Sequence, residues 1–107
     1  ENIRELGKRG LTFDICALPG QQEAALELVD ACPHTQFVLD HCGIPNLSEP
    51  EQFSFWRDTV KEYAKRSNVN AKLSGIVATA PKDSLSLELI SPYLNETFEA
   101  FGENRLL

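Results

Sequence analysis

The chain has 107 residues, a length that suits one domain or less. Its composition, 42% apolar and 24% charged residues, is typical of a globular protein. Its formal net charge of −6 argues against a nucleic-acid or anionic-membrane partner, because both require clustered lysine and arginine. No run approaches the roughly 18 apolar residues of a spanning helix. The chain has no methionine and begins inside a helical pattern. We therefore expect residues 1–107 to be an internal fragment of a single domain.

The three cysteines are Cys16, Cys32 and Cys42. Their number is odd and they contain no C-x-x-C pair, so the sequence predicts neither a disulfide framework nor a zinc finger. This favours a reducing compartment, and no signal peptide is visible, so we expect a cytoplasmic protein. We expect all three side chains to be buried or half-buried apolar groups.

The first half of the chain alternates between helical and extended patterns. Residues 1–8 resemble the end of a helix, with Gly10 suited to its C-terminal cap. Residues 11–18 alternate and are rich in strand-forming residues, and Pro19 follows them directly. Residues 21–31 carry an apolar stripe at helical spacing, and residues 36–40 form a second apolar strand. The order so far is helix, strand, helix, strand.

The next segment begins with a capping-box pattern. Ser48 is a candidate N-cap, Pro50 suits the first turn, and Glu51 completes the box. The helix should then run to about residue 66. Residues 69–74 form a third predicted strand.

A last helix is expected from Ser84, as its N-cap, to about Phe101, with a kink near Pro92. Residues 105–107 should begin a fourth strand. The predicted buried stripe of this helix consists of Leu87, Ile90, Leu94, Phe98 and Phe101.

Strands that recur every 25 to 35 residues, each followed by a helix, are typical of an α/β fold with a parallel sheet. The pattern fits a partial (β/α)8 TIM barrel of about three βα units plus the start of a fourth strand. It also fits an open doubly wound sheet. A complete barrel needs roughly 250 residues, so the chain would be less than half of one.

Several polar side chains fall where ligands bind in parallel α/β sheets, at the carboxyl ends of strands. His41 stands at the end of the second strand, just before a Gly-Pro turn. By strand alternation, Asp14 should face the interior of a barrel, as should Lys72 and Ser74. Buried polar groups are costly unless they find partners or a ligand. These polar side chains form either a ligand-binding site or a polar layer of the barrel interior, in which they bond to one another. By the same alternation Asp40 should point away from His41.

Three motifs in sequence carry a family resemblance. Residues 40–45 (DHCGIP) resemble the D-H-x-G-x-P motif of the amidohydrolase-related family, which includes 2-pyrone-4,6-dicarboxylate lactonase and sugar-lactone hydrolases. Residues 10–15 (GLTFDI) resemble the preceding G-L-x-F-D strand of that family, and residues 72–75 (KLSG) the following K-L-S-G strand end. The resemblance implies a (β/α)8 barrel that hydrolyses a small lactone or a related C–O or C–N bond.

The resemblance also implies roles for individual residues. Only His41 carries over as a catalytic residue, because the family's H-x-H pair and its water-activating aspartate have no counterpart in these 107 residues. His41 would help to bind a divalent metal (Zn or Mn), or would polarise the substrate carbonyl with no metal, as in some lactonases. Asp14, Lys72 and Ser74 are candidate substrate contacts, with Lys72 a partner for a substrate carboxylate. Ile44 replaces a lysine that is frequent in the family.

Two other functions remain open. One is an open α/β binding domain of flavodoxin-like type, although residues 18–21 offer only one glycine for a phosphate loop. The other is a barrel protein without catalytic activity. We expect a small-molecule substrate for the parent protein. We also expect no hydrolase activity from residues 1–107 alone, because they lack the general base.

Overall fold

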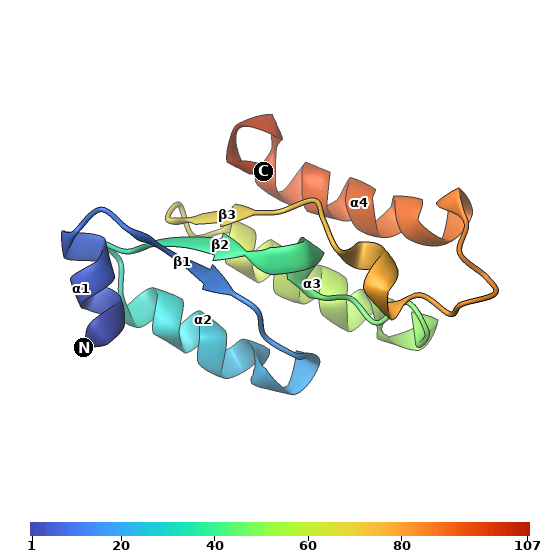
Figure 1. Ribbon diagram of the computed structural model, residues 1–107, viewed down its shortest axis with the longest axis horizontal. Helices are drawn as coiled ribbons and strands as arrows, with labels where there is room; N and C mark the ends of the chain where they lie inside the picture. The colour runs from blue at the N-terminus through green and yellow to red at the C-terminus, as the bar shows by residue number, and fades with distance from the viewer.

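The structure, a computed structural model, describes residues 1–107. Its centre is a parallel sheet of three strands in the order β1-β2-β3 (Figure 1). The strands are β1 (Thr12–Ile15), β2 (Gln36–Leu39) and β3 (Val69–Ala71). Each pairs in parallel with its neighbour in the sequence. The predicted α/β class with a parallel sheet is confirmed.

Four helices accompany the strands: α1 (Asn2–Lys8), α2 (Gln22–Ala31), α3 (Phe53–Ala64) and α4 (Leu87–Phe101). Helix α2 connects β1 to β2, and α3 connects β2 to β3. Across the molecule α2, α3 and α4 follow one another in the same order as the strands (Figure 1). Short 3-10 turns lie at Pro19–Gln21, Pro50–Gln52, Ile76–Thr79 and Glu103–Arg105. A tight turn that contains left-handed residues lies at Asp40–Gly43. No helix is both long and apolar enough to cross a membrane.

The hydrophobic core lies on one face of the sheet. Alternate strand residues point into it because successive side chains of a strand face opposite sides. All three of the longer helices contribute to the same cluster, so all three cover the same face. The cluster includes Ile15, Phe37, Leu39, Val69 and Ala71 from the strands and Val29, Trp56, Val60, Tyr63, Tyr93 and Phe101 from the helices.

The end of the chain adds an isolated β-bridge where the sequence predicts the start of a fourth strand. Leu106 pairs in parallel with Ala71. The Leu107 N–H donates to the Ala71 carbonyl at 2.9 Å, and the Leu73 N–H donates to the Leu107 carbonyl at 3.0 Å. Just before it, the Arg105 guanidinium donates to the Ala64 carbonyl at 2.9 Å, which satisfies a free carbonyl at the end of α3.

The strands are shorter than predicted, for a reason in the sheet itself. The last pair in the β1–β2 ladder is Ile15 with Leu39. At Asp40 the chain enters the tight turn over Asp40–Gly43, so Cys16 has no extended neighbour with which to pair. The side chain of Cys16 is exposed, contrary to prediction, whereas Cys32 and Cys42 are buried. Burial raises the pKa of the Cys42 thiol.

The predicted capping box at the start of α3 is wrong. A 3-10 turn over Pro50–Gln52 precedes the helix, which begins at Phe53. The Ser48 hydroxyl donates instead to the Thr79 carbonyl at 3.0 Å. Ser48 is therefore engaged with the segment after β3 and caps no helix.

Helix α4 also begins later than predicted. Its N-cap is Ser86, whose hydroxyl oxygen accepts from the Leu89 N–H at 3.2 Å, so the prediction of Ser84 was two residues early. Its buried stripe is rotated as well. Leu87 is 72% exposed and Phe98 is 51% exposed. The buried positions are Tyr93, Thr97 and Phe101.

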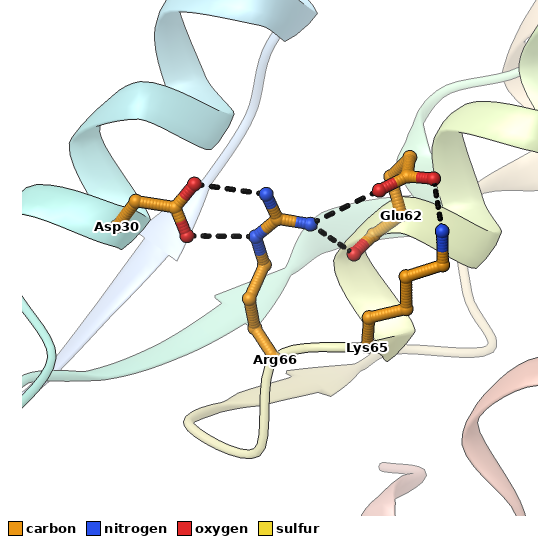
Figure 2. Close-up of polar contacts among 4 residues, drawn as sticks. All are labelled: Asp30, Glu62, Lys65 and Arg66. Atoms are coloured by element: carbon orange, nitrogen blue, oxygen red, sulfur yellow. Dashed lines mark hydrogen bonds and ion pairs between the residues drawn. The ribbon is translucent and has the colours of Figure 1, made fainter.

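An ion-pair cluster joins α2 to α3 at the ends that lead into β2 and β3 (Figure 2). The Arg66 guanidinium donates two hydrogen bonds to the Asp30 carboxylate, of 2.9 and 2.8 Å. It also donates to the Glu62 carbonyl at 2.6 Å, and Lys65 pairs with the Glu62 side chain. The bonds from Arg66 hold the pKa of the Asp30 carboxyl below its usual value. This cluster links α2 to α3 beside the edge of the sheet at which the strands begin.

Candidate functional site

The candidate site lies at the opposite edge, where the strands end. There β2 passes into Asp40–Gly43, and β3 passes into residues 72–75. Two backbone hydrogen bonds hold these ends together. The Lys72 N–H donates to the Leu39 carbonyl at 2.9 Å, and the Cys42 N–H donates to the Lys72 carbonyl at 2.9 Å. The polar residues that follow the two strands are therefore held side by side.

The backbone that carries His41 is strained. His41, Cys42 and Ile44 all adopt left-handed conformations, with φ of 53°, 54° and 52°. Each such residue other than glycine costs about 1–3 kcal/mol, and it persists only where its surroundings enforce it. The Ile44 N–H donates to the His41 carbonyl at 2.9 Å, and the Trp56 indole N–H donates to the Cys42 carbonyl at 2.8 Å. Packing of α3 thus enforces the turn that presents His41.

Two consecutive residues in the segment after β3, Ser74 and Gly75, contact the His41 ring. Its Nδ1 atom forms a hydrogen bond of 3.0 Å with the Ser74 hydroxyl. Gly75 lies against the same edge of the ring, since a Cβ atom at position 75 would be only 2.3 Å from Nδ1. Nε2 forms no hydrogen bond within the chain, so it is the nitrogen left free for a ligand or substrate.

An ion triad lies beside this histidine. The Lys72 ammonium is 2.6 Å from Asp14 Oδ2 and 2.8 Å from Asp40 Oδ1. The hydrogen bond to Asp14, and then the contact with Asp40, raise the pKa of Lys72. Asp40 has 15% of its side chain exposed, and its Oδ1 has no hydrogen bond of good geometry. Two carboxylates and one ammonium give the triad a net charge of −1.

The structure brings together the residues predicted from strand alternation, with one correction. Asp14 and Lys72 share the face opposite the core, as expected, and Ser74 lies close to His41. The prediction that Asp40 points away from the site is wrong, because its carboxylate contacts Lys72. Asp40 continues the alternation of β2. The direction of His41 follows instead from its left-handed backbone, to which strand alternation does not apply.

Two residues of the site were not predicted from the sequence. One is Asp40, which was excluded because alternation separates it from His41 and only His41 was expected to face the site. The other is Gly75, whose φ of 62° and contact with the ring both require the absence of a side chain. The glycine that closes the K-L-S-G motif was the available signal for Gly75.

The loops that follow β2 and β3 are tied to each other beyond the site. The Thr79 hydroxyl donates to the Pro45 carbonyl at 2.6 Å. The Leu47 N–H donates weakly to the same hydroxyl, at 3.4 Å. With the Ser48 bond to the Thr79 carbonyl, these contacts hold the two loops as one unit next to His41.

The residues present do not form a metal centre on their own. No group of three or more His, Cys, Asp or Glu side chains is arranged to hold a metal ion. His41 offers one free nitrogen, and the two nearby carboxylates, Asp14 and Asp40, are engaged by Lys72. A divalent ion needs several such donors, so this donor set alone does not fit one.

Comparison with known proteins gives consistent results. The profile of the amidohydrolase family matches residues 1–107. An uncharacterised protein of Sinorhizobium fredii is 34% identical over the whole chain, which spans 35% of that protein. The L-fucono-1,5-lactonase of Burkholderia ambifaria is 29% identical over 97 residues, or 91% of this chain and 33% of the lactonase. The chain thus spans about a third of the length of these relatives.

Solved structures agree with this assignment. Two crystal structures of an amidohydrolase from Burkholderia multivorans, one with bound zinc and one with bound HEPES, superpose with TM-scores of 0.90 and 0.88. They are 28% and 26% identical to this chain, and the match covers 97% of the chain and 38% and 39% of theirs. The family profile matches the chain from end to end, and we conclude that the chain belongs to the amidohydrolase family.

Proposed function

We propose that this chain is part of a (β/α)8 barrel hydrolase that opens a small lactone by attack of water on its carbonyl carbon. Sequential parallel strands, with three helices on one face, are the arrangement that a barrel wall requires. The superposition on 38% of an amidohydrolase with a TM-score of 0.90 supports this placement. The relation to a lactonase supports the reaction.

The observation that carries the proposal is the free Nε2 atom of His41 at the edge where the strands end. In the tautomer that carries a proton on Nε2, Nδ1 accepts from the Ser74 hydroxyl. The Nε2–H group then donates to the carbonyl oxygen of the lactone and stabilises the negative charge that builds there as water attacks. An aspartate outside these residues takes the proton from that water.

The ion triad bears on the class of lactone. Lys72 was predicted to bind a substrate carboxylate, but its charge already faces Asp14 and Asp40. With a net charge of −1, the triad repels an anionic substrate. Its carboxylate oxygens accept hydrogen bonds from hydroxyl groups. We therefore propose a neutral, hydroxyl-bearing lactone of the sugar-lactone type, as the name of the Burkholderia ambifaria relative suggests.

The predicted divalent metal remains a proposal. A zinc ion is bound in a related amidohydrolase from Burkholderia multivorans. In this chain His41 would supply one ligand at most, so the steps derived above use its imidazole alone. Metal analysis of the full-length protein measures the requirement directly.

The test is a lactone panel on the full-length protein, with neutral sugar 1,5-lactones in one arm and carboxylated lactones in the other. We expect hydrolysis of neutral lactones and little hydrolysis of carboxylated ones. Hydrolysis of the carboxylated set alone would reject the role of the triad. No hydrolysis of either set, from protein with and without added zinc or manganese, would favour the alternative of a barrel without catalytic activity.

A further inference from the structure

We propose that Ser74 is a positioning residue that fixes the orientation of the His41 ring, rather than a contact for the substrate. This inference rests on the proposed function only for its kinetic readout. The structure assigns the role through one contact, the 3.0 Å hydrogen bond between the Ser74 hydroxyl and Nδ1 of His41.

The Ser74 hydroxyl is directed at the histidine. It forms no other hydrogen bond within the chain, and Ser74 is only part-buried at this contact. A hydroxyl can donate to Nδ1 or accept from it, so it holds the ring in either neutral tautomer. In both cases Nε2 is the nitrogen that remains available.

The His41 ring needs such a partner because the backbone that carries it is strained. His41 and Cys42 are both left-handed, and the residues around them are what keep this turn in place. Gly75 leaves room for the ring but does not bind it. Among the side chains at the end of β3, only Ser74 forms a directional bond to the imidazole, whereas Lys72 is occupied by two carboxylates.

The reach of Ser74 follows from the backbone. The bonds Lys72 N–H to Leu39 and Cys42 N–H to Lys72 align the end of β3 with the turn after β2. Ser74 lies two residues beyond Lys72, on the same side of the chain by alternation. The position of its hydroxyl is thus set by the sheet, which makes it a rigid support for a catalytic group.

Kinetics of the full-length protein separate a positioning role from substrate binding. Losing an interaction made to the substrate in both ground and transition states raises KM and leaves kcat unchanged. Losing the support of a catalytic imidazole lowers kcat, by about 10- to 100-fold when judged by the outer-shell partners of metal-bound histidines. We expect S74A to lower kcat in this range with KM nearly unchanged, and S74T, which keeps the hydroxyl, to retain most of the activity. The matched control is S54A, because Ser54 is exposed on α3 and makes no side-chain hydrogen bond.

A spectroscopic readout tests the contact even if the protein hydrolyses no lactone. In nitrogen-15 spectra of the histidine rings, S74A should shift the Nδ1 resonance of His41 and leave that of the exposed His34 unchanged. H41Q and H34Q assign the two signals. An Nδ1 resonance that does not respond to S74A would overturn the proposal, as would a rise in KM with unchanged kcat. An inactive protein whose His41 signal still responds would reject the lactonase function alone.

Discussion

The ring of His41 occupies the space that a side chain on Gly75 would need. A Cβ atom at position 75 would lie 2.3 Å from Nδ1 and 2.5 Å from Cγ of the imidazole, well inside van der Waals contact. The strand end that bonds the histidine through Ser74 therefore also makes room for it through the next residue. The two consecutive residues act on one ring, which explains why a serine-glycine pair stands at this strand end.

The first prediction concerns this contact. G75A should displace the imidazole by a large fraction of an ångström or more. A misplacement of about 1 Å can lower the rate on the order of 100-fold, so we expect kcat to fall on this scale. Steady-state kinetics of the full-length variant with a neutral sugar lactone measure the effect.

Gly102 supplies the control for G75A. Its φ is 70°, close to the 62° of Gly75, but no atom lies within 4 Å of a Cβ built there. The ψ of Gly102 is 165°, against −3° at Gly75, in a region that is essentially restricted to glycine. G102A therefore carries a backbone penalty at least as large as that of G75A, without a clash. We expect both variants to lose stability and only G75A to lose activity. Equal kcat values for the two variants would contradict the role given to the His41–Gly75 contact.

The second prediction concerns the ion triad. In K72M, Asp14 and Asp40 lose the ammonium that lies between them, so their charges repel and the free energy of unfolding should fall at pH 7. The folded state raises the pKa of Lys72. Its contribution is therefore complete below the unfolded-state pKa of roughly 10.4 and is lost as the pH rises through the higher folded-state value. The difference in the free energy of unfolding between wild type and K72M should disappear only above about pH 10.

Denaturant unfolding of the full-length protein between pH 7 and pH 12 measures this difference. Lys82 is the matched control, because it is exposed and forms no ion pair, so K82M should cost little at any pH. A K72M variant as stable as K82M would show that the triad adds nothing to the fold.

The fold and the site were predictable to different degrees, for physical reasons. Hydrophobic periodicity located β2 and α2 closely because their patterns agree with their burial. The strand ends were less predictable, since the length of β1 depends on where β2 turns. Nothing local to Cys16 shows that its partner, Asp40, has already left the extended conformation.

The orientation of the site residues was also predictable only where the chain continues a regular strand. Alternation placed Asp14 and Lys72 correctly because both continue regular strands. It failed for the pair Asp40 and His41 because the left-handed turn starts between them. Four successive residues, 41–44, are left-handed, and three of them are not glycine. Tertiary contacts such as the Trp56 hydrogen bond enforce this turn, and sequence periodicity carries no sign of it.

The third prediction concerns the edge of the sheet at which the strands begin, opposite the candidate site. There Arg66 donates two hydrogen bonds to Asp30 (Figure 2). D30N should lower stability and leave kcat unchanged, because the pair lies away from His41. The pKa of Asp30 is lowered in the folded state, so its contribution is present above the unfolded-state value of about 3.9 and is lost as the pH falls through the lower folded-state value. The difference in stability between wild type and D30N should therefore become smaller below about pH 4.

The control for D30N is E27Q, on the same helix. Glu27 is exposed and forms no ion pair, so removing its charge tests the general effect of one fewer acidic group. Thermal melts from pH 2 to pH 7 compare the two variants. A stability loss that is the same at every pH, or that E27Q reproduces, would argue against the Arg66–Asp30 contact as its source.

The central claim is that Nε2 of His41 stabilises the charge on the lactone carbonyl oxygen. The most direct test is kcat/KM of H41A in the full-length protein on a neutral sugar lactone, with H34A as control and circular dichroism to verify folding. Alanine has no side-chain donor, whereas the amide of a glutamine could replace the Nε2–H group. Loss of one donor of this kind costs about 100- to 1,000-fold, and we predict a fall of that size for H41A and none for H34A. A folded H41A variant with kcat/KM within about threefold of wild type would contradict the claim.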